Sequence, residues 1–388
     1  MRASRAPAAQ SLRPLGLYLH IPFCTSKCPY CDFYSITDVR VLDRYLRALE
    51  KQMSAYEVQT RSYLVDTVYV GGGTPSLIDR RQWKRLFRTL RKHFRIAPGA
   101  EITVEVNPDS TVKKVLSTLR KLGVNRISIG AQSFNNDLLG AIGRRHTAEQ
   151  TMKAFEAARA ARIENVNLDL MFGLPGQTLE QLCLDLDTAT ALGASHLSVY
   201  GLKIEEDTPF WEVRDTLDLP DEKSWVEQYL EMTRRMRNGG YVQYEISNFC
   251  KPGCESKHNM KYWTLAEYLG LGAGASSYLG NRRFSFIKDV RSYCSAIETD
   301  EGQIVSEVFE VAPQDALADT VMLALRLSRG IHIDTFQRTF RRDFVALFGS
   351  KLEKYIHAGL VVVEDGYCRL TSRGFCVSNH IIADLIDL

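Results

Sequence analysis

Long apolar runs are missing from this chain of 388 residues. A helix that crosses a membrane needs about 20 mostly apolar residues in a row, so the sequence predicts no transmembrane segment. The first residues, MRASRAPAAQSLRP, also contain no apolar stretch of the kind that a secretory signal requires. We therefore expect a cytoplasmic protein in which residues 1–14 form a flexible tail.

A strong excess of one charge is missing as well, because the formal net charge is only +3. This small value does not indicate nucleic-acid binding. Basic residues crowd one segment, and a solvated helix face explains them better than a patch that binds a partner. These residues are Arg80, Arg81, Lys84, Arg85, Arg88, Arg91, Lys92 and Arg95.

Nothing in the cysteine pattern resembles a secreted disulfide framework. The nine cysteines are odd in number and irregularly spaced along a long chain. Small secreted domains depend on closely spaced, paired cysteines, whereas cytosolic proteins keep their thiols reduced. We expect free thiols.

What the sequence does contain is a regular alternation of short β-branched or aromatic runs with longer helical patterns. Six predicted strands begin near residues 15, 65, 101, 126, 165 and 196. Such alternation is typical of parallel βα units. The predicted fold class is α/β, an incomplete (β/α)6 barrel over residues 15–240. The predicted helices include 41–56, 82–94, 111–122, 148–163 and 224–237. Capping boxes at Thr147 with Gln150 and at Thr178 with Gln181 mark two helix starts.

Two further regions follow the predicted barrel. Residues 241–305 form an extension, and residues 306–388 combine helices with a short hairpin that turns at Asp365 and Gly366. This last pattern predicts a winged-helix-like α+β domain. The mixed charge of its hairpin makes packing or a lid role at least as favoured as DNA binding.

Chemically capable residues follow the ends of the predicted strands, where parallel βα folds gather their active sites. The first strand leads into CTSKCPYC, which places Cys24, Cys28 and Cys31 on one short loop. Three thiolates suit a [4Fe–4S] cluster with one iron left open. The alternative is zinc, with His20 as a fourth ligand.

CxxxCxxC after the first strand, with Tyr30 before the third cysteine, resembles the radical SAM superfamily. GGGTP after the second strand resembles the segment of that family that meets S-adenosylmethionine. Glycines at these positions let backbone groups approach a ligand closely. The resemblance implies a [4Fe–4S] cluster, S-adenosylmethionine and an electron donor for the cluster.

Six segments in order resemble the HemN/HemW group of that superfamily, which is linked to porphyrin biosynthesis. They are LYLHIPFC, GGGTPS, EVNPD, RISIGAQSF, GRRH and NVNLDLMFGLPGQT. The resemblance implies that one set of residues contacts S-adenosylmethionine, through hydrogen bonds and charges that suit its polar groups. That set is Tyr18, Tyr30, Gly72, Gly73, Thr74, Glu105, Gln132, Arg144 and Asp169.

Two departures separate the chain from the HemN-type oxidases. Phe33 stands where those enzymes have a further cysteine, and only 23 residues precede Cys24. In both respects the chain is similar to HemW proteins. The segment HNMKYW also resembles the HNxxYW segment, which is linked to haem binding in that family. The resemblance implies that His258, Asn259, Tyr262 and Trp263 bind haem, with His258 as a possible axial ligand. A structural histidine in an aromatic core, and a second metal site with Cys250 and Cys254, are the alternatives.

The resemblance therefore implies a haem chaperone that binds haem and delivers it to haem-requiring acceptors such as respiratory proteins. Metal binding at Cys24, Cys28 and Cys31 and transient contact with a membrane are part of this expectation. The alternative is oxygen-independent coproporphyrinogen III oxidase, an activity that the departures make improbable. A radical SAM enzyme with another substrate is the third possibility.

Overall fold

The computed structural model describes residues 12–108, 112–299 and 303–387. Of the tail predicted over residues 1–14, residues 1–11 lie outside the described part. Across the described residues, none of the helices has the length and apolar character that a membrane span requires.

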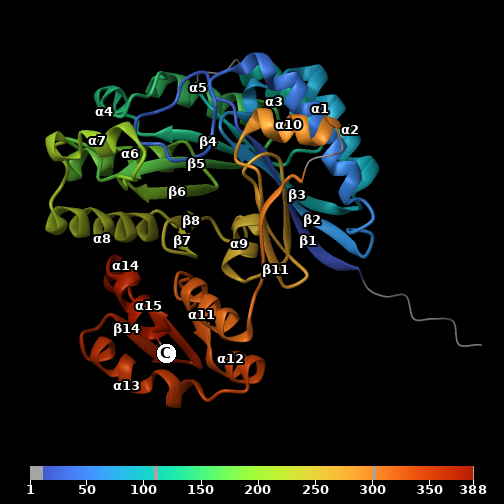
Figure 1. The fold of residues 1–388 in the computed structure, drawn as a ribbon. Helices are drawn as coiled ribbons and strands as arrows, with labels where there is room; N and C mark the ends of the chain where they lie inside the picture. The colour runs from blue at the N-terminus through green and yellow to red at the C-terminus, as the bar shows by residue number, and fades with distance from the viewer. Residues whose placement is uncertain (1–11, 109–111, 300–302, 388) are drawn as a thin grey trace, which may run out of the picture.

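Six parallel strands form the core of the molecule, and they lie side by side in chain order (Figure 1). The six strands predicted from the sequence are therefore confirmed. They are β1 (Arg13–Ile21), β2 (Tyr63–Gly72), β3 (Ile96–Val106), β4 (Arg126–Gln132), β5 (Asn165–Phe172) and β6 (His196–Gly201). Neither β1 nor β6 pairs with the other, so the barrel stays open and the predicted incomplete (β/α)6 class is correct.

Helices cover the outer face of this sheet. Both predicted capping boxes are present, at Thr147 with Gln150 and at Thr178 with Gln181. A third, at Asp79 with Gln82, was not predicted. The helices that follow β1 to β6 are α1 (Leu42–Tyr56), α2 (Arg80–His93), α3 (Val112–Lys121), α4 (Asn136–Ala141), α5 (Ala148–Ala160), α6 (Leu179–Ala191), α7 (Pro209–Glu212) and α8 (Glu222–Asn238).

The basic segment lies on α2, whose buried face is apolar and includes Trp83 and Leu86. Most of its basic side chains are exposed, as expected for a solvated face. Arg85 is the half-buried exception, and it pairs with Asp43 and Glu50.

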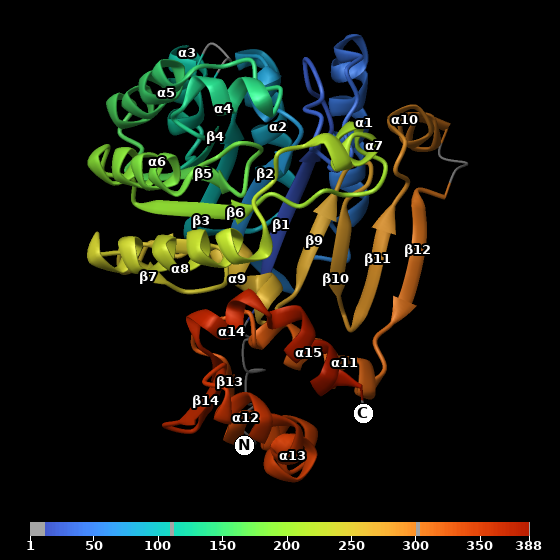
Figure 2. The same ribbon diagram turned by 90° about the vertical axis from the view of Figure 1, so that its left-hand side faces the viewer.

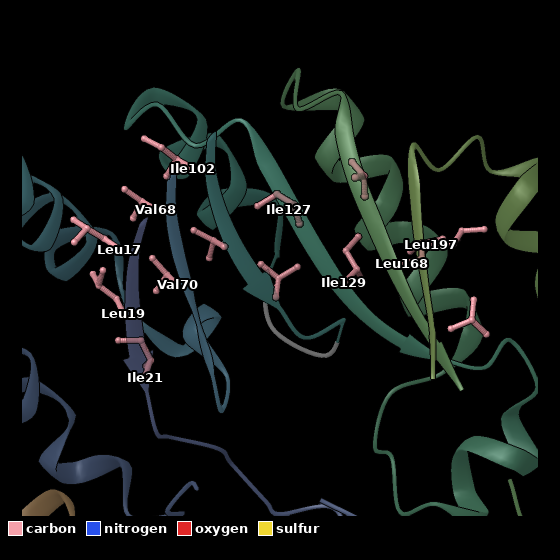
Figure 3. Close-up of a cluster of buried hydrophobic side chains, with 14 of the residues drawn as sticks. Leu17, Leu19, Ile21, Val68, Val70, Ile102, Ile127, Ile129, Leu168 and Leu197 are labelled. Atoms are coloured by element: carbon pink, nitrogen blue, oxygen red, sulfur yellow. The ribbon is translucent and has the colours of Figure 1, made fainter. Parts of the chain in front are cut away.

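Alternation along the strands separates two chemically different faces. Outward-facing apolar residues pack beneath the helices, and Figure 3 shows this layer on neighbouring strands. Inward-facing positions are largely polar. Because side chains in a strand alternate between faces, this period of two gives the sheet a dry outer core and a polar interior. The labelled core residues are Leu17, Leu19, Ile21, Val68, Val70, Ile102, Ile127, Ile129, Leu168 and Leu197.

The extension lengthens the sheet at both edges, to twelve strands in the order β12-β11-β10-β9-β1-β2-β3-β4-β5-β6-β8-β7. At one edge β8 runs antiparallel to β6, and at the other β9 runs parallel to β1. The sequence patterns did not predict these short strands. They are β7 (Val242–Gln243), β8 (Asn248–Cys250), β9 (Tyr268–Leu271), β10 (Ser276–Leu279), β11 (Arg282–Phe286) and β12 (Val305–Glu310), accompanied by α9 (Lys257–Trp263) and α10 (Val290–Thr299).

The C-terminal residues form the predicted α+β domain, with a three-stranded antiparallel sheet in the order β13-β15-β14. Asp365 and Gly366 both have positive φ, which confirms the predicted hairpin turn. The elements are α11 (Pro313–Ala324), β13 (Ile331–His332), α12 (Ile333–Phe340), α13 (Phe344–His357), β14 (Val361–Glu364), β15 (Tyr367–Leu370), α14 (Ser372–Cys376) and α15 (Ser378–Ile386).

This domain lies at the end of the barrel where the strands begin, on the side of α8 and α9 (Figure 2). The backbone N–H of Ile246 donates to the carbonyl of Arg326, and that of Ser328 donates to the carbonyl of Tyr244. The strands end at the opposite side of the barrel. A lid role over those ends, one of the alternatives for this domain, does not match this placement.

Candidate functional site

The three cysteines of CTSKCPYC lie on the loop that follows β1, at the carboxyl ends of the strands. All three are free thiols and are partly exposed. The Thr74 hydroxyl donates to Sγ of Cys24 at 3.6 Å, and Nη1 of Arg144 donates to Sγ of Cys28 at 3.7 Å. The sequence therefore brings two thiols into contact with donors from the β2 and β4 loops, as a thiolate site requires.

The electrostatics of this loop suit a cation. Burial raises the pKa of the Cys31 thiol, and Cys28 and Cys24 raise it further. The thiolate form of Cys31 is therefore disfavoured until positive charge lies close to it. Among the described side chains, no three of His, Cys, Asp or Glu converge as around a single metal ion.

His20, the alternative zinc ligand, has both ring nitrogens in contact with groups other than the cysteines. Its Nδ1 lies 2.8 Å from the Tyr18 hydroxyl, and its Nε2 lies 3.1 Å from the carbonyl of Tyr34. Burial lowers the pKa of this imidazole. With both ring nitrogens engaged, His20 has no lone pair directed at the cysteines.

Close packing of the backbone requires the glycines of GGGTP, whether or not a ligand binds next to them. A Cβ on Gly73 would lie 2.6 Å from the carbonyl oxygen of Phe23, and Gly72 has φ +115° with the His20 ring in the place of its Cβ. The backbone N–H of Gly73 donates to Ile21, and that of Thr74 donates to Phe23. These contacts of the glycine run hold the start of the cysteine loop against the end of β2.

A cavity of about 400 Å³ opens between the cysteine loop and the strand ends. Most of the predicted S-adenosylmethionine set lines it, together with the three cysteines. The set members at the cavity wall are Tyr30, Gly72, Gly73, Thr74, Glu105, Gln132, Arg144 and Asp169. Tyr18 is not part of the wall, because its hydroxyl turns to His20 inside the barrel.

Glu105 and Asp169 are the two buried carboxyl groups of the cavity. Glu105 accepts from the Tyr69 hydroxyl at 2.8 Å and from the backbone N–H of Gly72 at 3.1 Å. Burial raises its pKa to about 7, against the lowering effect of the Tyr69 hydrogen bond. Burial also raises the pKa of Asp169, which accepts from Ser128 and Asn167. Both carboxylates become more stable as anions when a cation enters.

Arg144 and Gln132 occupy the far wall of the cavity. Nη2 of Arg144 donates to Oδ1 of Asn107 at 2.7 Å and to the carbonyl of Gly130 at 2.9 Å, which fixes the guanidinium plane. Gln132 has φ +65° and follows a register shift between β4 and β5. A non-glycine residue in the left-handed region is costly, and such strain is concentrated at functional sites.

Sequence reasoning missed the inward-facing polar residues that support this wall. Tyr69, Ser128 and Tyr200 also line the cavity. Arg126 lies deeper in the barrel, almost fully buried, and its charge lowers the pKa of both Glu105 and Asp169. The available signal was alternation, because polar or small residues recur at every second position in RISIGAQ and in NVNLD.

The predicted haem residues lie outside the cavity, on α9. None of the four lines the cavity. His258 is 1% exposed, its Nδ1 lies 2.8 Å from Oγ1 of Thr67, and its Nε2 lies 2.9 Å from the Tyr262 hydroxyl. Its backbone N–H donates to Glu101 at 3.1 Å. In this conformation His258 has no free ring nitrogen to offer an iron.

Aromatic rings complete the surroundings of His258. Its ring stacks on Tyr69 with 5.3 Å between centroids and meets Tyr262 edge-on at the same separation. Burial lowers the pKa of the imidazole to about 3, so it is neutral. Because Tyr69 in turn donates to Glu105, this segment packs beneath the cavity floor. The described residues also form no three-ligand group with Cys250 and Cys254.

Two family models match the chain. The Radical SAM superfamily model matches residues 18–189, and the HemN C-terminal domain model matches residues 311–377. The open barrel and the three-cysteine loop at its strand ends thus define a protein of the radical SAM class.

Sequence relatives show which family within this class the chain belongs to. The chain is 38% identical over 369 residues to the heme chaperone HemW of Bacillus subtilis (strain 168), which covers 94% of this chain and 97% of that protein. It is 35% identical over 372 residues to HemW of Lactococcus lactis subsp. lactis (strain IL1403), covering 95% and 96%. The chain belongs to the HemW family.

A solved structure has the same architecture over nearly the whole length. The coproporphyrinogen III oxidase HemN from Escherichia coli, described as a radical SAM enzyme, superposes with a TM-score of 0.86 at 25% identity. The match covers 98% of this chain and 92% of that one. The family and this structural match together give the chain a haem-related function.

Proposed function

We propose that the protein is a haem chaperone, which binds haem and passes it to haem-requiring acceptor proteins in the cytoplasm or at a membrane surface. The observation that carries the proposal is the similarity to haem chaperones along almost the entire length of both chains. Phe33, at the position where the oxidases have a further cysteine, also supports it.

The cavity is the proposed place of two cofactors. Cys24, Cys28 and Cys31 would hold a [4Fe–4S] cluster, and the cavity wall would hold S-adenosylmethionine. When bound, the pair supplies one-electron chemistry that cleaves the sulfonium group, with electrons from a separate donor. Arg144 suits a carboxylate, and Glu105 and Asp169 suit an amino group or ribose hydroxyls.

The chain's own residues have three tasks in this arrangement. The glycine run fixes the cysteine loop, Arg126 favours the ionised carboxylates, and Tyr69 orients Glu105. The interior below the cavity is closed by a chain of hydrogen bonds from Asp169 through Asn167 and His196 to Tyr244. These contacts fix the cavity floor and exclude bulk water from it.

Cofactor binding is tested on anaerobically reconstituted protein. We expect close to four irons per chain from a [4Fe–4S] cluster and a change in its electron paramagnetic resonance spectrum on adding S-adenosylmethionine. Replacing Cys28 by Ser should abolish iron loading. Stoichiometric zinc without iron would contradict the proposal.

Coproporphyrinogen III oxidase activity is the second candidate, because the superposed HemN structure covers most of both chains. The sequence difference at Phe33 argues against it. The two functions are separated by giving the same preparation both ferric haem and coproporphyrinogen.

A further inference from the structure

The rim of the cavity has a composition that the two cofactors do not explain. Phe33 belongs to the cavity lining, yet 66% of its surface is exposed to solvent. Lys27 and Arg145 line the same cavity and are also exposed. An aromatic ring and two cationic side chains at one opening are suited to bind a flat apolar ligand that carries carboxylate groups.

The charge balance of the rim favours an anion. Lys203 is paired with Glu205 at 2.5 Å, which neutralises that side of the opening. Lys27 and Arg145 remain, against the exposed carboxylate of Asp32. The two cations come from different loops, since Lys27 lies between the cysteines and Arg145 lies between α4 and α5.

Apolar surface continues from the rim into the wall. Met171 and Leu202 line the cavity, and Met171 belongs to a separate buried cluster with Phe210. Tyr30 packs against this cluster, with its ring 6.4 Å from that of Phe210. A macrocycle stacked on Phe33 would therefore meet a firm apolar wall.

We propose that this rim, formed by Phe33, Lys27 and Arg145, is the haem seat. This inference rests on the proposed haem-binding function and states where that function is carried out. Phe33 contacts the face of the macrocycle, and Lys27 and Arg145 bind its propionates. His258 takes no part, since it lies beneath the cavity lining, almost fully buried, with both ring nitrogens in contact with the hydroxyls of Thr67 and Tyr262.

The lining of the seat has a consequence for transfer. Among the residues that line the cavity there is no histidine, and in the proposed arrangement Phe33, Lys27 and Arg145 contact the face and the propionates rather than the iron. Haem held by its face and its propionates keeps an iron coordination site open. An acceptor that offers an axial histidine then gains a metal–ligand bond, which drives transfer towards it.

The test is a titration of the full, cluster-loaded chain with three probes: ferric haem, metal-free protoporphyrin and protoporphyrin dimethyl ester. Phe33→Ala should weaken ferric haem and protoporphyrin binding about tenfold, the value of a lost stacking contact. Leu184→Ala on α6 is the matched control, because Leu184 is 65% exposed and lies outside the cavity lining.

A second variant tests the positive charge of the rim at a residue outside the cysteine loop. Arg145→Ala should weaken binding of both carboxylate-bearing probes about fivefold and leave the dimethyl ester unchanged, as loss of one charge-assisted contact implies. Arg237→Ala, at an exposed position on α8, is the control. Iron content per chain checks that each variant keeps its cluster.

The outcomes separate the seat from the function. If no variant changes the affinity while wild-type protein binds haem, the seat is wrong and the chaperone function stands. If protoporphyrin fails to bind and His258→Gln abolishes ferric haem binding, iron ligation by His258 replaces the seat. If wild-type protein binds no haem, the proposed function itself fails.

Discussion

Replacing His258 by Ala should destabilise the fold, because this histidine is a structural element of the barrel interior. Its ring makes two hydrogen bonds, to Thr67 and Tyr262, at 2.8 and 2.9 Å. Each buried neutral hydrogen bond contributes about 1 kcal/mol, and the two partners would be left unsatisfied. Lost packing against Tyr69 and Tyr262 adds about 1–2 kcal/mol. We expect a total loss of about 3 kcal/mol.

Urea unfolding of the apo chain measures this loss. Intrinsic fluorescence follows the unfolding, with Trp263 on the same helix as one of the four tryptophans of the chain. His357→Ala is the matched control, because His357 is exposed near the end of α13. A loss in His258→Ala no larger than in the control would refute the reasoning and would mean that the ring is free to move.

The pH dependence gives the same prediction a second readout. Burial depresses the pKa of His258 to about 3, so in the folded state it stays neutral while the unfolded chain binds a proton below about 6.5. Stability from this group is therefore present above pH 6.5 and is lost as the pH falls. Below about pH 6 the slope should be smaller in His258→Ala than in wild type, by up to about 1.4 kcal/mol per pH unit.

Three further predictions concern the cavity. Because burial raises the pKa of Glu105 to about 7, S-adenosylmethionine should bind more tightly as the pH rises from 6 to 8; isothermal titration should show that Glu105→Gln removes this dependence, and an unchanged pH profile would contradict it. Arg126→Met should move the same profile to higher pH, since Arg126 lowers the pKa of Glu105; a shift to lower pH would exclude this effect. Gly73→Ala should cost most of the iron loading, because its Cβ would lie 2.6 Å from the backbone of Phe23, whereas Gly140→Ala meets no atom within 4 Å and should load normally.

The strand ends were predictable from the sequence because alternation and chain order alone determine which residues meet there. Cys24, Glu105 and Asp169 are far apart in the chain, and the parallel βα rule brings them to one cavity. Arg126 and Tyr69 could not be assigned in the same way. Their role depends on which face of the sheet is concave, and a hydrophobic pattern does not specify that.

The HNxxYW segment shows the limit of reasoning from a motif. Its residue types fit a haem site as well as they fit an aromatic core, and in this structure His258 lies among aromatic rings. The segment between the short strands β8 and β9 brings α9 against β2, where Glu101 accepts from the backbone N–H of His258 and Thr67 contacts its ring. Those strands are too short and irregular to be recognised from alternation.

The most direct test of the central claim is one anaerobic preparation, cluster-loaded and supplied with S-adenosylmethionine and reductant, given coproporphyrinogen III in one half and ferric haem in the other. The account predicts no protoporphyrinogen in the first half and a saturable Soret change in the second, with Escherichia coli HemN as the positive control for turnover. Multiple turnovers of coproporphyrinogen, or the absence of a saturable Soret change, would contradict it.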